Sequence, residues 1–322
     1  MADWVVHDYL SKSEIQKLIR PSDLKGFQAL LTTWGLISFS FFLVARYPSV
    51  GSVAIALVIL GGRHLALGIL MHDAAHYSLF KTRPLNDWIG SWLCAYPGLQ
   101  DLRAYRRHHL QHHKLAGSKD DPDLDLVEAY PVSRASLFRK MIRDLTGITG
   151  LKRLYGVGLM NLGLIEYTVS GRVVRIEQKG EPSWQIILTG LKNASGWILT
   201  NLALWGVLWG FGHPHLYLLW IISYMTTFSL FIRIRSIAEH ACTDVGLNPL
   251  QCTRTTHAGI SARLTVAPHY VNYHLEHHIL MTVPGFRLAQ MHQLLKERGG
   301  LGQAFLASSY FEVLRTASSK SS

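Results

Sequence analysis

The 322-residue sequence is poor in cysteine and in charge. Its three cysteines, Cys94, Cys242 and Cys252, form no CxxC pair, which excludes a disulfide framework and a thiolate zinc module. Charged residues make up 16% of the chain, below the roughly 25% of soluble proteins, and the mean hydropathy is +0.15. These shortages argue against two soluble domains. The excess of 32 Lys and Arg over 21 Asp and Glu therefore favours an anionic lipid surface over nucleic acid as the partner.

Four long apolar runs take the place of the missing charge. A bilayer core about 30 Å thick needs roughly 20 apolar residues in one helix, so we expect membrane-spanning helices over 28–47, 52–71, 196–212 and 215–232. The third could begin near Ile186. Short turns between neighbouring runs pair these helices as two hairpins. Two shorter apolar stretches, 88–99 and 154–168, are expected to form helices in or near the membrane interface.

The basic residues predict the orientation in the membrane. Of the 32 Lys and Arg, only Arg46 and Arg63 fall inside the four expected spans, and neither short turn contains one. The remaining basic residues, both termini and the long 72–195 segment therefore share one side, which the positive-inside rule makes the cytoplasm. No signal-peptide pattern opens the chain, and we expect a protein of a bacterial inner membrane. The expected parts are a cytoplasmic segment 1–27, one membrane domain 28–310 and a disordered tail 311–322.

The 17 histidines are clustered on the predicted cytoplasmic side. The clusters are HDAAH at 72–76, HHLQHH at 108–113 and HLEHH at 274–278, and His240 follows the fourth span. Residues i and i+3 or i+4 share a helix face, so each cluster can present two or three imidazoles to neighbouring ions. Structural zinc takes four ligands, so nine are too many for one ion. An all-nitrogen site of two ions favours redox iron and O₂ over hydrolysis. The expected ligands are His72, His76, His109, His112, His113, His240, His274, His277 and His278.

Two positions in this ligand set have competitors. His108 competes with His109, because His108-x₃-His112-His113 is also a permitted spacing, and we prefer His109 because its spacing matches the third cluster. His269 competes with His240.

Metal-bound imidazoles usually donate their second N–H to a carboxylate or carbonyl. The expected partners are Asp73, Glu239 and Glu276, with Asn272 as a further candidate. The acidic residues of the DDPDLD run, Asp120, Asp121, Asp123 and Asp125, could also serve, but a solvated loop role is equally open to them.

Arg63 lies near the middle of the second span, where a charge costs roughly 2.5–3.5 kcal/mol on insertion. None of the expected spans contains an acidic residue to pair with it. One hypothesis is that Arg63 and His64 bind a substrate headgroup. The alternative, which we favour, is burial against backbone carbonyls near Gly61 and Gly62.

HDAAH, HLQHH and HLEHH, in this order and interleaved with two hairpins, resemble the three histidine boxes of the membrane fatty acid desaturase/hydroxylase superfamily. The resemblance covers roughly residues 50–295, and NYHLEHHILMTVPGF is similar to the acyl-lipid desaturase branch. It implies a non-haem di-iron centre, dioxygen as oxidant, a long-chain acyl or alkyl substrate, and His240 as the ninth ligand. The first box differs from that of animal acyl-CoA Δ9 enzymes, and the third lacks the Gln typical of front-end desaturases. No HPGG motif of a fused cytochrome b5 is present, so we expect the electron donor to be a separate ferredoxin, rubredoxin or cytochrome.

The expected protein is all-α and integral to the membrane. Four transmembrane helices form two hairpins, and a cytoplasmic helical cap carries a histidine-rich dimetal site. Its expected activity is desaturation of a fatty acyl chain. Hydroxylation and oxidative decarboxylation to a terminal alkene are alternatives on the same scaffold, because the outcome depends on substrate placement. A metal-transporting membrane protein is a remote alternative, since Arg63 and His64 are the main ionisable residues within the expected spans.

Overall fold

The computed structural model of the protein describes residues 4–178, 180–246 and 248–320. Its first half is built on a hairpin of two long helices, α2 (Asp23–Arg46) and α3 (Val50–Ala75). Helix α3 begins with a reciprocal capping box between Ser49 and Ser52, which satisfies two of the free N–H groups at its start. The hairpin confirms the first two predicted helices.

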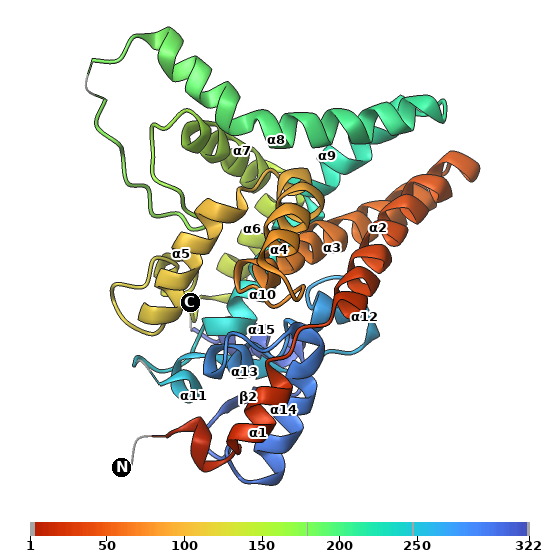
Figure 1. Cartoon of the computed structure of the whole chain (residues 1–322). Coiled ribbons are helices and arrows are strands. Elements are labelled where there is room, and N and C mark those ends of the chain that lie inside the picture. Colours follow the sequence, from red (N-terminus) through yellow and green to blue (C-terminus); the bar gives the residue numbers. More distant parts are fainter. Residues whose placement is uncertain (1–3, 179, 247, 321–322) are drawn as a thin grey trace.

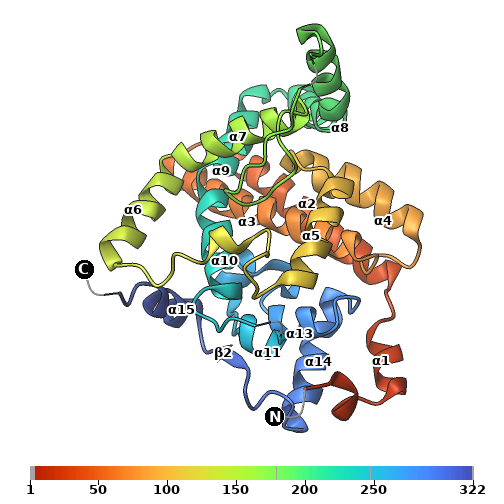
Figure 2. The same cartoon turned by 90° about the vertical axis from the view of Figure 1, so that its left-hand side faces the viewer.

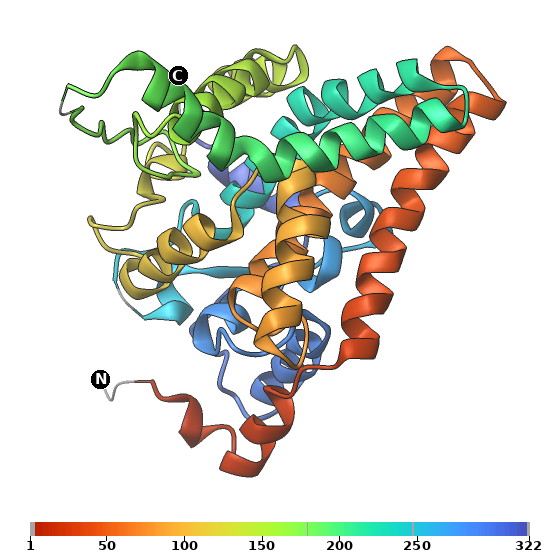
Figure 3. The same ribbon diagram turned by 45° about the horizontal axis from the view of Figure 1, so that its top comes forward.

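The second pair of predicted spans differs in detail. The fourth predicted span, 215–232, falls in a broken helix formed by α9 (Tyr217–Met225) and α10 (Thr227–His240). The 3₁₀ turn η5 (Pro214–Leu216) precedes it. Among the described residues, three segments are long and apolar enough to cross a membrane: Asp23–Arg46, Val50–Ala75 and Pro214–His240. Helix α8 (Ser183–Gly210) has 28 residues but is not among them, since Lys192, Asn193 and Asn201 lower its hydropathy. Figure 3 shows α8 alongside α9, at the end of the molecule that also holds the α2–α3 turn. The four-span topology therefore stays a prediction.

The two shorter apolar stretches fold as predicted only in part. Residues 88–99 fall in a run of short helical pieces, α4 (Arg83–Ile89), the π-helix η2 (Gly90–Ala95) and the 3₁₀ turn η3 (Tyr96–Gly98). The 154–168 stretch is helical only to the end of α7 (Ile148–Asn161). Helix α6 (Arg134–Leu145) precedes α7, and Figure 2 shows these two helices following one another along one edge of the molecule.

The histidine-bearing cap is assembled from short elements at the end of α3 and α10 (Figure 1). Helix α5 (Leu102–Leu115) carries the second histidine cluster, and α13 (His274–Ile279) carries the third. One parallel pair of strands, β1 (Arg254–Thr256) and β2 (Phe305–Ala307), lies beside them. The remaining elements are η1 (Val6–Asp8), α1 (Lys12–Leu18), η4 (Leu124–Leu126), α11 (Pro249–Cys252), α12 (Ile260–Leu264), η6 (Pro268–Tyr270), α14 (Gly285–Glu297) and α15 (Tyr310–Ala317).

The predicted disordered tail over 311–322 is wrong for most of its length. Ser309 caps helix α15, whose Val313 and Ala317 are buried in one cluster with Ile237 and Ala238 of α10. The apolar spacing of this short helix gives it a face that the cap covers. Within the 311–322 segment, only residues 321–322 lie outside the described residues. The N-terminal segment is also attached to the cap, because Glu14 forms an ion pair with Arg298.

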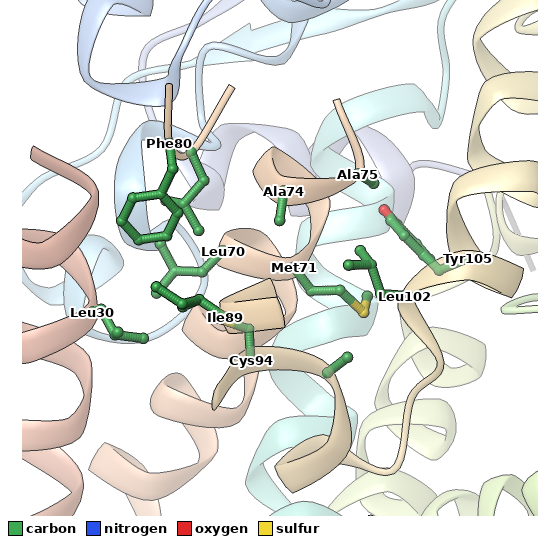
Figure 4. Close-up of a cluster of buried hydrophobic side chains, with 12 residues drawn as sticks. Leu30, Leu70, Met71, Ala74, Ala75, Phe80, Ile89, Cys94, Leu102 and Tyr105 are labelled. Atoms are coloured by element: carbon green, nitrogen blue, oxygen red, sulfur yellow. The ribbon is translucent and has the colours of Figure 1, made fainter. Parts of the chain in front are cut away.

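A buried apolar cluster holds the end of α3 against α5 (Figure 4). Met71 and Ala74 of α3 contribute to it, as do Leu102 and Tyr105 of α5. Gly90 allows this packing, because a Cβ at this position would lie 2.6 Å from the Cβ of Ala74. The cluster therefore fixes the relative position of the first two histidine boxes.

Candidate metal centre

All nine predicted histidine ligands converge in the cap and divide into two groups. Within each group, one nitrogen of every ring lies within 4.8 Å of one nitrogen of every other ring. The first group, from α3, α5 and α13, is His72, His76, His109, His113 and His277. The second group, from α5, α10 and α13, is His112, His240, His274 and His278.

Helical spacing explains the division. On α5, His109 and His113 are four residues apart and join the first group, whereas His112 between them joins the second. On α13, His274 and His278 join the second group and His277 joins the first. Residues i and i+4 share a face, so each of these helices directs one pair at one group and the intervening ring at the other.

The ring nitrogens face one another at short distances. The Nε2–Nε2 separation is 2.9 Å for His72 and His277, and also for His277 and His113. It is 2.8 Å for His240 and His274. Two nitrogens bound at about 2.1 Å to one ion lie about 3.0 Å apart when they subtend a right angle. The observed separations therefore fit adjacent ligands of a metal ion.

Several rings have one nitrogen that faces the other rings of its group and a second, outer nitrogen that points away from them. Hydrogen bonds on these outer nitrogens leave the facing nitrogens without protons. The Nδ1 of His240 lies 3.0 Å from the Cys252 carbonyl oxygen, which only accepts, so this Nδ1 carries the hydrogen. His72 Nδ1 lies 3.0 Å from Asp73 and His112 Nδ1 lies 2.8 Å from Asp121. The lone pairs on the corresponding Nε2 atoms then point into the groups. Such nitrogens suit a cation as their common partner.

Burial disfavours the charged form of most imidazoles in the two groups; the exception is His112, whose contact with Asp121 raises its pKa despite its burial. Burial lowers the pKa of His109, His113 and His277, and the neighbouring imidazoles lower it further. The same causes lower the pKa of His274 and His278. Within the described chain, the Nε2 atoms of His76 and His278 are buried without a hydrogen-bond partner. Neutral imidazole is the form that binds a metal ion, so the groups fit the metals that the sequence predicts.

The predicted outer partners divide into two pairs. Asp73 contacts His72, and a Glu239 oxygen lies 3.5 Å from His274 Nδ1 while it pairs with Arg235. Glu276 instead contacts His292 and Thr255, and the amide of Asn272 donates to the Thr256 carbonyl. The structure thus places neither Glu276 nor Asn272 against a ring of the two groups.

Of two partners that the structure places at the second group, the sequence left Asp121 undecided and gave no indication of the Cys252 carbonyl. Asp121 was one of several acidic residues of a loop, with nothing in the DDPDLD pattern to single it out. The Cys252 contact is made by a backbone carbonyl, which carries no side-chain signal. Both lie in segments that follow a histidine-bearing helix and fold back onto it.

The two competing histidines lie outside both groups. His108 Nε2 lies 2.8 Å from an oxygen of Asp123. His269 Nε2 lies 2.8 Å from the Thr33 hydroxyl of α2, and its backbone has a positive φ of 51°. These positions agree with the choice of His109 and His240.

Arg63 is 3% exposed and contacts the cap from within α3. Its Nη2 donates to the Leu264 carbonyl at 3.0 Å, at the end of α12. Gly62 permits this approach, because a Cβ there would lie 2.1 Å from the same carbonyl oxygen. His64 packs on the ring of Trp220 with centroids 3.7 Å apart. These contacts agree with the favoured interpretation, burial against backbone carbonyls, although the carbonyl belongs to α12.

In the described part of the chain, one cavity lies at the metal groups and another lies among the long helices. A small one is lined by Ile69, His72, Asp73, His269, His274 and His277, and so touches both groups. An apolar cavity of about 370 Å³ lies between α8 and α9, with Trp197, Trp205, Trp220 and Tyr224 in its wall. Ile69 in the wall of the small cavity and Tyr224 in the wall of the larger one belong to the same buried apolar cluster.

Comparison with known proteins agrees with this geometry. The family model described as fatty acid desaturase matches residues 48–308, a range that contains all nine histidines. Dihydrorhizobitoxine desaturase of Bradyrhizobium elkanii is 25% identical over 251 residues, covering 76% of this chain and 68% of that protein. The sn-1 oleoyl-lipid 12-desaturase of Synechocystis sp. is 25% identical over 289 residues, covering 86% and 77%. The protein of the same name from Anabaena variabilis is 21% identical over 249 residues, covering 72% and 65%. The resemblance seen in the histidine boxes is thereby confirmed: the chain is an oxidoreductase that belongs to the fatty acid desaturase family.

Proposed function

We propose that this protein is a di-iron enzyme that desaturates the acyl chain of a membrane lipid. The observation that carries the proposal is the pair of adjacent imidazole groups, five rings in one and four in the other, at the cap end of α3. Imidazole suits iron. Two ions with six positions each would retain open positions for O₂. When bound, the irons supply the oxidising power, with O₂ and electrons from a separate ferredoxin, rubredoxin or cytochrome.

The chain's own contribution is to hold the rings in one tautomer and to keep water away. Asp73, Asp121 and the Cys252 carbonyl fix the hydrogen on the outer nitrogen of their rings, so that the inner nitrogen is available as a ligand. Most of the nine rings are buried. Water exclusion favours oxidation of the substrate over loss of the oxidant to solvent.

The proposed substrate is an apolar chain that enters from the lipid. The cavity between α8 and α9 is lined by aromatic and aliphatic side chains, as expected of a pocket for an apolar ligand. The cluster of Ile69 and Tyr224 then leads toward the small cavity at the metal groups. The relatives named above are described by different substrates, dihydrorhizobitoxine and an oleoyl lipid. The lipid assignment therefore rests on this apolar lining and on the membrane helices.

We further propose that α8 is the fourth membrane span, which places both termini and the metal centre in the cytoplasm of a bacterial cell. Its 28 residues extend about 42 Å at 1.5 Å per residue, and it exposes Ile187, Leu191, Leu199 and other apolar side chains.

An acidic electron donor could dock on the exposed basic side chains Arg103, Arg107 and Lys114 of α5.

Product analysis tests the proposed activity. The protein is expressed in a host that is fed fatty acids, and the extracted lipids are examined by mass spectrometry. Desaturation predicts a product that has lost two hydrogens, and His277→Ala serves as the inactive control. A product that has gained one oxygen would instead identify a hydroxylase, and a shortened terminal alkene a decarboxylase. Absence of any oxidised product, with no oxygen consumption by the purified enzyme and its donor, would refute the proposal.

A further inference from the structure

The two imidazole groups are oriented by different means. In the second group, His112, His240 and His274 have contacts on their outer nitrogens, to Asp121, the Cys252 carbonyl and Glu239 respectively. In the first group, His72 has such a partner in Asp73. Across the described segments, no hydrogen bond is found on the outer nitrogens of His76, His109, His113 and His277. The orientation of these rings therefore depends on packing, such as that of Tyr105 on His109, and on the backbone that carries them.

One side chain joins the backbone segments of the first group. Arg106 lies on α5, and its Nε donates to the Ala75 carbonyl at 2.9 Å and its Nη2 to the Ala74 carbonyl at 3.1 Å. These carbonyls belong to the last turn of α3, where a helix leaves its C=O groups without intrahelical partners. His76 is the next residue after this turn. Arg106 thus binds the end of α3 at the residue that precedes a predicted ligand.

The same guanidinium also fixes the chain beyond His76. It lies 4.1 Å from the ring centroid of Tyr77, whose φ of 56° is in the left-handed region. Its Nη2 donates to Asp87 of α4 at 2.6 Å. The residue that follows the ligand is therefore held in an unusual conformation by stacking, and Asp87 balances the buried part of the positive charge.

The position of Arg106 on α5 relates these contacts to the second box. Arg106, His109 and His113 are spaced at i, i+3 and i+7, and so lie on one face of the helix. This face meets the end of α3, where His72 and His76 belong to the same group. Arg103 and Arg107 are exposed on the same helix and make no such contact with α3 among the described residues.

We propose that Arg106 is a positioning residue for one of the two metals, the one held by His72, His76, His109, His113 and His277. This inference rests on the dimetal centre proposed above. Arg106 sets the first histidine box against the second, whereas three of the four rings of the second group have outer contacts of their own. Lysine would retain the charge at this position but cannot match the planar fork that reaches two carbonyls and a carboxylate.

Metal content per chain tests the proposal. Purified wild-type protein and the Arg106→Ala, Arg106→Lys and Arg103→Ala variants are loaded with iron, and bound iron is measured by elemental analysis and by Mössbauer spectroscopy. We expect Arg106→Ala to lose half of the bound iron and the spectral component of one site, Arg106→Lys to lose less, and Arg103→Ala to match wild type. Thermal unfolding in detergent shows whether each variant is folded. Asp87→Asn provides a milder change of the same contact if Arg106→Ala does not fold.

Combined variants show which metal is affected. Arg106→Ala added to His240→Ala, which damages the second group, should remove the remaining iron. Added to the His109→Ala and His113→Ala pair, which damages the first group, it should remove no more. Equal loss from both sites, or unchanged iron in folded Arg106→Ala and Asp87→Asn proteins, would overturn the role of Arg106. A wild-type protein that binds fewer than two irons per chain would instead refute the dimetal proposal itself.

Discussion

Replacement of Asp121 with Asn is expected to weaken binding of one metal while the other is retained. Asp121 is buried, and its Oδ1 lies 2.8 Å from His112 Nδ1 and 2.9 Å from the Asp123 backbone N–H. An Asn amide can present its NH₂ group to His112, and this would favour the tautomer that carries its hydrogen on Nε2. That nitrogen would then be blocked as a ligand in the second group.

The magnitude follows from the role of the carboxylate. Loss of a partner that orients a metal-bound histidine typically costs 10–100-fold in metal affinity, which is about 1.4–2.7 kcal/mol at 1.36 kcal/mol per factor of ten. The first group does not include His112, so its affinity should stay within about twofold of wild type.

The assay is a titration of metal-free protein with Fe²⁺ under anaerobic conditions, with a chromogenic chelator as competitor. Two binding events of similar affinity in wild type should separate in Asp121→Asn into one unchanged and one weakened. Asp120→Asn is the matched control, because Asp120 is the exposed neighbour in the same loop. An Asp121→Asn protein that binds both ions as tightly as wild type would refute the reasoning about the outer hydrogen bond.

Three further substitutions test the packing, the arginine in the span and the cavity. Gly90→Val should lower the free energy of unfolding by about 1–3 kcal/mol through overpacking against Ala74. Thermal unfolding in detergent measures this change, and an unchanged unfolding midpoint would contradict the close contact. Arg63→Leu should destabilise the protein, because it leaves the α12 carbonyl unpaired, while the KM of the folded fraction stays the same; a raised KM would favour the headgroup hypothesis instead. Ile198→Trp should fill the cavity between α8 and α9 and so shift the products toward shorter acyl chains. The exposed neighbour Leu199→Trp is the control. If the two variants give the same distribution of product chain lengths, this cavity is excluded as the acyl site.

The histidine site was predictable from the sequence because its information is local. Two residues four apart on a helix share a face whatever the surrounding fold, and three such clusters with His240 were enough to predict that nine rings meet. The spacing did not reveal that His112 and His113 point to different groups. This division depends on which helices lie on either side of α5, and that is a property of the tertiary structure.

The prediction of the outer partners was less successful because adjacency in sequence is a poor guide to contact. Glu276 lies between two ligands on α13, yet successive helical residues point about 100° apart, and its carboxylate is directed at His292 of α14. Asp121 is nine residues beyond His112 and reaches it through a loop. For α8 the difficulty is that asparagines lower the mean hydropathy of the helix whatever they contact. In the structure they form hydrogen bonds within the protein; the Oδ1 of Asn201, for example, accepts one from the Tyr217 hydroxyl.

Because His112 and His113 are consecutive, as are His277 and His278, neighbouring rings on one backbone belong to opposite groups at two separate points. Consecutive Cα atoms are about 3.8 Å apart and joined by a rigid peptide unit. In the proposed dimetal centre, the spacing of the two ions is therefore tied to the covalent geometry of the chain. Thermal motion of α5 or α13 would move ligands of both ions together, so this spacing would persist while the surrounding long helices flex.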